Sequence, residues 1–547
     1  MKRKDSGQER RSSRLLALLL GVLVAVQILF MGYWGTQKEG YHVDEIYTYG
    51  LSNSYYLPFL DSAENFENHW LTPDDFSKYV KTQDGTRFKY DSVYYNQERD
   101  VHPPLYYFLI HTIASLLPGT FSKWIGIGLN ILFFAISIVL VYCICLQITK
   151  RRWLSILPCT FWGFSAGAIS SVVFIRMYAM LTCLTLLITW LTFRLLDSDK
   201  ISLKQMAALS TVALIGFLTQ YYFVVYLFFL FVGTALFLFL QKRFRDFWKY
   251  TGSLALGGVL GILFFPTSLS HIFFGYRGKE NQSNLLLLGN WKSRIRSYVT
   301  IVNDGLFGGF LKAFVLLFIG LLLLAGIKAL VARSQVRSID QQERIFSKIA
   351  ALFRNPSLSK FFILGFTSLF YFLLISKISS YEIDRYMFPI FPQIGILAMV
   401  SVSSVILFTC KAPRFAGAIS LAICIALCPA GILRGNISYL YPGAQEADQI
   451  AASHSAELCV VVSDFPNRIH ENFTAFSQYH GVYFTRPENL SLLSQGLAEQ
   501  GELSSFVLYV DTSVDQSSTL QQVKSSAHLT NSQELSSFNI FTGYYIA

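Results

Sequence analysis

Charged residues are scarce in this sequence. Asp, Glu, Lys and Arg make up 14% of the 547 residues, whereas apolar residues make up 53% and phenylalanine alone occurs 48 times. Most side chains of such a chain cannot face water, so a polytopic membrane protein is predicted. The formal net charge of +11 comes from short basic clusters between apolar runs. This pattern orients helices in a bilayer and argues against nucleic-acid binding.

Cysteines are also few, and glycine-rich phosphate-binding loops are missing. All of the eight cysteines except Cys459 lie in or beside apolar runs, so neither a disulfide framework nor a zinc site is indicated. No Walker-type or Rossmann-type loop is present. The usual sites for nucleotides are therefore not predicted.

About eleven apolar runs are long enough to cross a membrane. The first, Leu15 to Trp34, follows a basic segment and lacks a small-residue cleavage site, which predicts a retained anchor with a cytoplasmic N-terminus. The predicted fold class is a polytopic α-helical membrane protein. The other runs occupy residues 122–148, 153–174, 177–196, 203–219, 221–240, 251–272, 305–331, 360–379, 387–409 and 415–433.

A twelfth apolar run, residues 104–118, decides the orientation of the chain. With about 15 residues it is short for a span. If it stays outside as an interfacial or re-entrant helix, the basic segments at Lys150, at Gln241 and in the loop 333–360 all face the cytoplasm, in agreement with the positive-inside rule. The first external loop then covers residues 35–103.

The tail, residues 434–547, differs from the rest in composition. It has four basic and eleven acidic residues and is predicted to be a separate, extracellular accessory domain. Its runs "LCVVVSD", "GVYFT" and "SFVLYVDTS" alternate with helix-like segments, which predicts a small α/β unit with parallel strands. The transmembrane module accordingly takes residues 1–433. We expect the tail to pack on the outer loops or to touch an acceptor.

The first external loop carries carboxylates at both ends. It begins with "HVDEIYTYG", which contains Asp44 and Glu45, and closes with "RDVHPPLYYF", which contains Arg99, Asp100 and His102. Since both ends are tethered to membrane helices, they can meet above the bilayer and form an acidic pocket. The alternative for Asp44 and Glu45 is ordinary helix-start charge on a solvated loop.

Two arginines, Arg176 and Arg385, lie at tips between apolar runs on the same predicted face. An arginine at such a depth is costly without a partner, so both are candidate site residues. Snorkelling to the interface is the alternative. Tyrosines crowd these tips and would otherwise form an interfacial aromatic belt: Tyr178, Tyr221, Tyr222, Tyr381 and Tyr386.

A further predicted external loop, residues 275–304, carries five basic residues against the positive-inside rule. Binding an anionic lipid head group or a phosphate would account for them, and so would an inverted chain. The five are Arg277, Lys279, Lys292, Arg294 and Arg296.

A carboxylate that faces arginines at the outer bilayer surface suits one reaction. The carboxylate takes the proton of an incoming hydroxyl, which attacks a sugar whose leaving group is a lipid-borne phosphate. The arginines stabilise the charge of that phosphate. A single displacement of this kind inverts the anomeric centre. Since no ATP is present outside the cell, a donor activated by a lipid phosphate also explains the missing nucleotide loops.

Five short motifs carry a resemblance to a known family: "HVDEIYTYG", "DVHPPLYYFLI", "IRMYAMLTCLTLL", "LTQYYFVVYLFF" and "DRYMFPIFP". From about residue 15 to about residue 433 the chain resembles the GT-C glycosyltransferases of family 39, the group with protein O-mannosyltransferases and lipid A aminoarabinose transferases. The resemblance implies a polyprenyl-phosphate sugar donor. It also implies that Asp44 is the catalytic first-loop acid with Glu45 beside it, that His102 belongs to the site, and that Arg176 and Arg385 lie near the donor.

The sequence departs from this pattern at one point. In several relatives a basic residue follows the two prolines by a few positions, but none occurs from Leu105 to Ile110. This departure raises the importance of Arg99, Arg176 and Arg385 for the donor phosphate.

The sequence therefore predicts an inverting glycosyltransferase of the cell membrane that uses an extracytoplasmic acceptor: a cell-wall glycopolymer, a lipid or a protein. Asp44 is the predicted base and Glu45 its orienting partner, because adjacent helix residues point about 100° apart. No cofactor is required, although Asp44, Asp100 and His102 could share a divalent metal. The alternatives are a transporter or flippase of polyprenyl-linked or other anionic lipids, and a sensor or scaffold.

Overall fold

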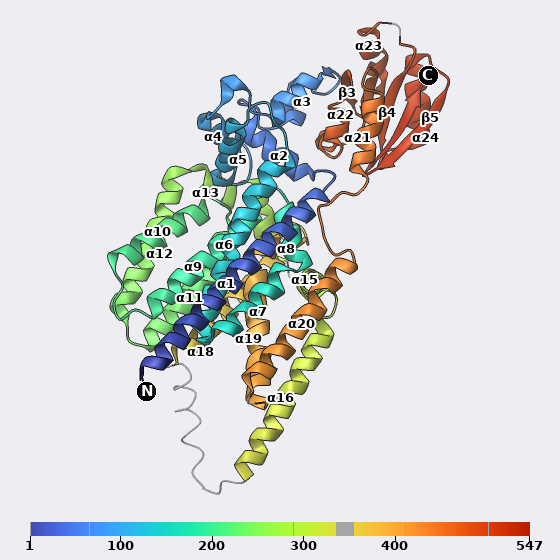
Figure 1. Cartoon of the computed structure of the whole chain (residues 1–547). Coiled ribbons are helices and arrows are strands. Elements are labelled where there is room, and N and C mark those ends of the chain that lie inside the picture. The colour runs from blue at the N-terminus through green and yellow to red at the C-terminus, as the bar shows by residue number, and fades with distance from the viewer. Residues whose placement is uncertain (1, 65, 288, 335–354, 411, 502) are drawn as a thin grey trace.

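The computed structural model describes residues 2–64, 66–287, 289–334, 355–410, 412–501 and 503–547. It consists of a long helical bundle with a smaller sheet-containing domain at the end opposite the N-terminus (Figure 1). In the described part of the chain nine helices are long and apolar enough to cross a membrane. They are α1 (Lys2–Thr36), α6 (Lys123–Thr149), α9 (Tyr178–Leu196), α11 (Tyr222–Leu240), α12 (Phe244–Phe264), α16 (Leu311–Ser334), α18 (Pro356–Ile378), α19 (Phe391–Cys410) and α20 (Pro413–Leu433).

Two of the expected spans have a different form. The run 153–174 is a pair of helices, α7 (Arg152–Gly163) and α8 (Ala166–Val173), bent by 62°. The break occurs where the Ser165 side chain accepts a hydrogen bond from the Ala168 N–H and so begins a new helix. The run 203–219 is the 15-residue α10 (Leu203–Phe217). With the bent pair counted as one span, the described residues hold up to ten spans rather than the expected eleven.

The segment 275–304, predicted as an external loop, is largely helical. A short helix α13 (Thr267–Phe273) begins after Pro266, followed by α14 (Tyr276–Leu286) and α15 (Trp291–Phe307). Gly308 and Gly309 then adopt positive φ angles of 57° and 88° and separate α15 from α16. Most of the basic loop 333–360 lies outside the described residues.

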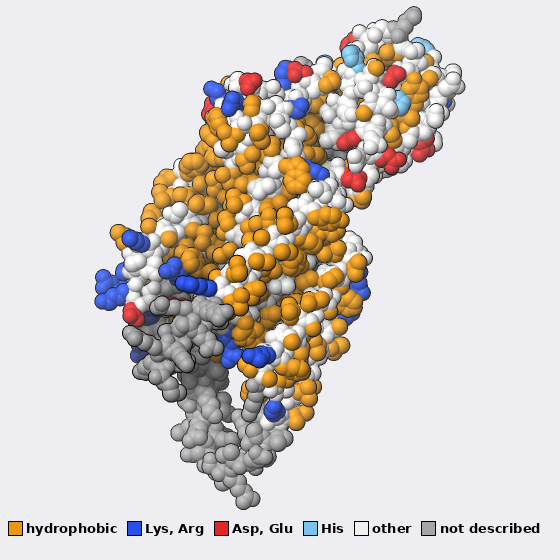
Figure 2. Space-filling view, in the orientation of Figure 1, with side chains coloured by type: hydrophobic (Ala, Val, Ile, Leu, Met, Phe, Trp, Pro, Cys, Tyr) orange, Lys and Arg blue, Asp and Glu red, His pale blue; other side chains and the backbone are white. Residues whose placement is uncertain are grey.

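The first external loop folds into helices that lie beside one end of the bundle (Figure 1). They are α2 (Val43–Asn53), α3 (Pro73–Val80) and α4 (Tyr90–Glu98), followed by the short apolar helix α5 (Leu105–Leu116), which corresponds to the predicted interfacial helix. Hydrophobic side chains cover the visible face of the bundle. Acidic side chains appear on the C-terminal domain (Figure 2). This surface fits a multi-pass membrane protein.

The C-terminal domain contains the three predicted parallel strands. β2 (Leu458–Val462) pairs in parallel with β3 (Gly481–Thr485) on one side and with β4 (Phe506–Asp511) on the other. A hairpin of β5 (Ser532–Phe538) and β6 (Phe541–Ile546) extends the sheet antiparallel to β4. The helices of this domain are α21 (Ala444–Ser453), α22 (Phe473–Phe476), α23 (Leu493–Ala498) and α24 (Gln516–Ala527).

The first external loop adds a strand of its own to this sheet. β1 (Trp70–Leu71) pairs antiparallel with β3, so that Trp70 lies opposite Tyr483. The Trp70 indole Nε1–H donates to the Gly496 carbonyl at 2.9 Å, and Glu67 forms an ion pair with Arg486 at 2.6 Å. The loop and the tail are therefore parts of one six-stranded sheet, with the order β1-β3-β2-β4-β6-β5.

Trp70→Ala should loosen the attachment of the C-terminal domain to the first loop. Truncation of a buried Trp costs about 3–5 kcal/mol, and the half-buried Trp70 should cost ~2–3 kcal/mol. Limited proteolysis of the full chain in nanodiscs should then cut faster between residues 434 and 444. Leu492→Ala, at an exposed position of the same domain, is the matched control. Equal cleavage of both variants would show that β1 does not hold the domain.

Candidate active site

The site begins with the N-terminus of α2. The His42 ring Nδ1 accepts a hydrogen bond from the Asp44 N–H at 3.0 Å, and the Glu45 carboxylate accepts one from the His42 N–H at 2.7 Å. This reciprocal cap is a capping box in which histidine takes the place of Ser or Thr. It fixes the first turn of α2 and thereby the directions of Asp44 and Glu45.

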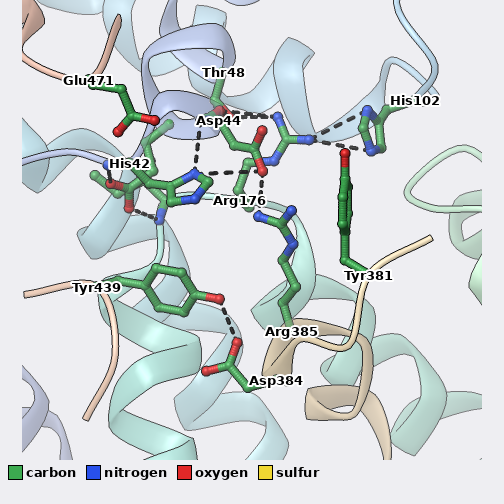
Figure 3. A network of polar contacts seen from close by, with 12 residues as sticks. His42, Asp44, Thr48, His102, Arg176, Tyr381, Asp384, Arg385, Tyr439 and Glu471 are labelled. Carbon is green, nitrogen blue, oxygen red and sulfur yellow. Dashed lines mark hydrogen bonds and ion pairs between the residues drawn. The ribbon is translucent and has the colours of Figure 1, made fainter. Parts of the chain in front are cut away.

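Asp44 points toward two arginines from distant parts of the chain (Figure 3). Its carboxylate forms an ion pair with Arg385, which lies in the short 3₁₀ turn Asp384–Tyr386 ahead of α19. Its backbone carbonyl accepts a hydrogen bond from Arg176 Nη1 at 3.2 Å. The predicted acid and the two predicted arginines therefore share one site, although 341 residues separate Asp44 from Arg385.

Arg176 lies in the break between α8 and α9 and is only 4% exposed. Its Nη1 also donates to the Thr48 hydroxyl at 3.1 Å and to the Tyr107 hydroxyl at 3.0 Å. Its Nη2 lies 3.3 Å from His102 Nε2. The burial and these contacts rule out snorkelling for this side chain.

Both guanidinium groups retain an unused donor. Within the described residues, Arg176 Nε and Arg385 Nε are buried and have no hydrogen-bond partner. Buried N–H groups are rarely left unpaired in proteins. Two such donors at one site are suited to an anion such as a phosphate.

The far end of the first loop reaches the same place, as predicted. Asp100 and His102 form a pair at 2.9 Å, and the His102 ring lies beside Arg176 (Figure 3). Arg99 is exposed and stacks on the Tyr95 ring at 3.5 Å, with Nη1 donating to the Tyr95 carbonyl. The structure thus leaves Arg99 at the rim of the site and outside the network of Arg176.

Glu45 turns away from the arginines. It is fully buried, pairs with the equally buried Lys38 at 2.9 Å, and accepts the Ile175 N–H at 2.6 Å. Because Ile175 precedes Arg176, this bond fixes the backbone of Arg176 relative to α2. This geometry fits the predicted orienting role of Glu45. The buried carboxylate faces Lys38 and the Ile175 N–H and is not among the residues that line the cavity.

A cavity of about 1000 Å³ opens at this site. Asp44, Arg176 and Arg385 line one part of it, together with Asp100 and His102. The predicted tyrosines also line it: Tyr178, Tyr221, Tyr222, Tyr381 and Tyr386. A second part of the wall is apolar and comes from α11, α13, α14 and α18: Val224, Val225, Ile272, Leu285, Leu374 and Ile378.

Arg277 also lines the cavity. It lies between the rings of Tyr276 and Tyr381, 4.9 Å from each centroid, and pairs with Glu280 at 2.9 Å. The excess of basic residues in the segment 275–304 had indicated an anion-binding role for this arginine. The helix that carries it, α14, was not predicted.

No protein-family model and no curated protein matches the sequence. Among solved structures, ArnT from Cupriavidus metallidurans in the apo state aligns with 98% of this chain and 98% of its own, at 10% identity and a TM-score of 0.52. The crystal structure of the same protein bound to undecaprenyl phosphate aligns over 96% and 98%, at 12% identity and a TM-score of 0.50. The chain has the GT-C fold. Likeness at these identities does not single out family 39 within that fold.

The GT-C fold of this chain does not assemble a cluster of metal ligands in the residues that the structure describes, since no three His, Cys, Asp or Glu side chains there are placed to hold an ion. Arg176 contacts both Asp44 and His102. A metal shared by Asp44, Asp100 and His102 would therefore meet a guanidinium group.

Three residues that contribute to this site were not predicted from the sequence. His42 caps α2, Lys38 neutralises Glu45, and Asp384 accepts a hydrogen bond from the Tyr439 hydroxyl at 2.5 Å beside Arg385 (Figure 3). His42 and Asp384 could have been inferred, because each lies within two residues of a predicted site residue. Lys38 has no such signal.

The charges around Asp44 decide its ionisation. Burial raises the pKa of the Asp44 carboxyl, but Arg385 and Arg176 outweigh burial and hold that pKa below its ordinary range. Burial also lowers the pKa of His42 to about 4. Asp44 is thus an anion and His42 a neutral ring at neutral pH. The ion pair of Asp44 stabilises the fold above pH ~4, and this stabilisation is lost as the pH falls through the depressed pKa.

Removing the cap should destabilise α2 without changing any charge at neutral pH. His42→Ala should lower the free energy of unfolding by ~1 kcal/mol, and His42→Asn by less, because asparagine also caps helices. Since His42 is neutral above its pKa, the difference between the two variants should be constant from about pH 6 to about pH 8. Thermal unfolding in nanodiscs measures it. A difference that grows toward pH 6 would show that His42 is charged.

Proposed function

We propose that this chain is an integral-membrane inverting glycosyltransferase that transfers a sugar from a polyprenyl-phosphate donor to an extracytoplasmic acceptor. One observation carries the proposal. A carboxylate and two buried guanidinium groups with unused N–H donors line a cavity whose wall continues into apolar helix faces. These are the parts that a phosphate, a sugar and a polyprenyl chain each require.

The arginine end of the cavity is the proposed place of the donor phosphate. Arg176 Nε and Arg385 Nε would donate to its oxygens, and the apolar wall between α11, α14 and α18 would take the first isoprene units. A protein of the same fold, ArnT, has been crystallised with undecaprenyl phosphate. This precedent supports a lipid phosphate as the ligand.

The reaction is a single displacement. The acceptor hydroxyl oxygen attacks the anomeric carbon while the bond between that carbon and the phosphate oxygen breaks. The lipid phosphate leaves with the electron pair, and the arginines stabilise its charge. Asp44 takes the hydroxyl proton. Attack from the face opposite the phosphate inverts the anomeric centre.

Asp44 is a weak base as long as it is paired with Arg385, because the pair lowers its pKa. A bound phosphate competes for the same guanidinium group. When Arg385 turns to the phosphate, the carboxylate loses its partner and becomes more basic. Donor binding would thus prepare the base before the acceptor arrives.

The position of the arginines favours transfer over transport. Arg176 and Arg385 lie just ahead of α9 and α19, at one end of the bundle and beside the first-loop helices. A transporter or flippase that rocks around a central site would place such groups near the bilayer midplane. With the basic clusters of the opposite end in the cytoplasm, the positive-inside rule puts this site and the C-terminal domain outside.

Asp44→Asn should bind undecaprenyl phosphate more tightly and transfer sugar more slowly. Removing the competing anion should raise the affinity roughly fivefold, which is ~1 kcal/mol. Loss of the base should slow consumption of labelled undecaprenyl-phosphate sugars by roughly 10²–10⁴. Both are measured on purified protein in nanodiscs, with the exposed Asp74→Asn as control. Wild-type donor consumption by a folded Asp44→Asn would refute the base assignment.

Arg385→Ala should weaken undecaprenyl phosphate binding roughly tenfold or more, since a charge-assisted bidentate contact is lost. Arg385→Lys should restore only part of the affinity, because an ammonium group cannot bind in the same planar way. The exposed Arg245→Ala, at the start of α12, is the matched control. Equal affinities for Arg385→Ala and Arg245→Ala would show that Arg385 does not contact the phosphate.

A further inference from the structure

One side of the cavity is formed jointly by the first loop and the C-terminal domain, and the described residues that line it include no arginine. Tyr47, Phe59, Asp61 and Ser62 line it from the first loop, and Asn467 lines it from the 3₁₀ helix Pro466–His470. The neighbouring Arg468 is directed elsewhere, 3.6 Å from Glu471 and 3.8 Å from Asp511. Tyr47 follows Asp44 by three residues on α2, so both face the same side of that helix.

His470 brings the C-terminal domain into contact with this side. Its ring lies 4.5 Å from the ring of Tyr47, and its side chain is fully buried. Its Nδ1 lies 3.1 Å from the Asn467 carbonyl oxygen. Since a carbonyl oxygen can only accept, Nδ1 carries the hydrogen. Burial lowers the pKa of His470, so the neutral ring presents Nε2 as an acceptor.

This acceptor faces another acceptor. His470 Nε2 lies 4.0 Å from Asp61 Oδ1, and within the described residues neither atom has a hydrogen-bond partner. The second oxygen of Asp61 already accepts from the Tyr47 hydroxyl at 3.2 Å. A buried pair of acceptors without a donor is costly. Asp61 lines the cavity, so a ligand that brings an O–H or N–H group to this side would supply the missing donor there.

We propose that Tyr47, Phe59, Asp61 and Asn467 form the acceptor subsite, with the buried His470 ring packed against Tyr47 and facing Asp61 from behind, and that the acceptor is a neutral, hydroxyl-bearing saccharide. The proposal rests on the glycosyl transfer proposed above and names the acceptor class for it. Carboxylate and amide groups accept hydroxyl hydrogens. The rings of Tyr47 and Phe59, 5.6 Å apart, offer an apolar surface to the face of a sugar.

The same residues exclude a phosphate as the receiving group. Asp61 would repel a phosphate, and among the described residues that line this side there is no Lys or Arg to neutralise one. Arg176 and Arg385 lie on the donor side, where both contact Asp44 and would bind the donor phosphate. The cavity is thus positively charged on one side of Asp44 and acidic on the other. This difference would direct the donor phosphate to the arginine side and a neutral acceptor to the acidic side.

The test uses the full-length protein in nanodiscs with the labelled undecaprenyl-phosphate sugar that the wild type consumes. Nitrophenyl glucoside and its phosphate ester serve as acceptor probes. We expect transfer to the neutral glucoside only. Asp61→Asn and His470→Ala should each raise the KM for the glucoside roughly tenfold. The first variant loses a hydrogen bond to the acceptor, and the second loses the ring that packs against Tyr47. Affinity for undecaprenyl phosphate, measured on the same samples, should change less than twofold.

Two exposed positions supply the controls, Glu64→Gln in the first loop and His480→Gln in the C-terminal domain. Both should keep the wild-type KM. Transfer to the phosphate ester, transfer to neither probe, an unchanged KM in Asp61→Asn and His470→Ala, or an equal rise in the controls would each overturn the subsite. If the wild type binds undecaprenyl phosphate but consumes no donor sugar, the proposed function itself fails, and the subsite falls with it.

Discussion

The architecture of the site depends on keeping two guanidinium groups buried at the end of a membrane bundle. Such a charge is stable there only if a carboxylate and hydrogen-bond acceptors surround it. Asp44 supplies the carboxylate for Arg385, while Thr48, Tyr107 and the Asp44 carbonyl supply acceptors for Arg176. The acceptors do not satisfy every donor, and the Nε atoms left over mark the place where we propose that the donor phosphate binds.

The two adjacent carboxylates of α2 have different partners. Asp44 faces the arginines, and Glu45 points into the protein against Lys38 and the Ile175 N–H. If α2 were mobile, the Asp44 carboxylate could not keep a defined position while Arg385 binds to it and leaves it. The buried pair of Glu45 and Lys38 holds α2 in place, so Asp44, the proposed base, could exchange partners without movement of its helix.

Local features of the site could be predicted from the sequence, because each has a cause that lies within a few residues. The two ends of the first loop, the arginines at the span tips and the parallel strands of the tail are of this kind. The β1 strand could not be predicted, since Trp70 and Leu71 become a strand only by pairing with β3, more than four hundred residues away. The break at Ser165 was missed because apolar residues continue through it. Lys38 was missed because nothing near it in the sequence identifies Glu45 as its partner.

The path of the chain explains why a distant domain can contribute to this site. Next to α2, Lys38 Nζ donates to the Tyr439 carbonyl at 2.6 Å, and the Glu39 N–H donates to the Leu440 carbonyl at 2.8 Å. On the other side of α2, β1 joins the sheet of the same domain. The C-terminal domain is therefore attached on both sides of the helix that carries Asp44. A domain held at two points around one helix has little freedom to swing away, so its 3₁₀ helix Pro466–His470 stays positioned over the cavity. In this chain the tail is a wall of the site, and the acidic side of the cavity exists only because the loop and the tail fold as one sheet.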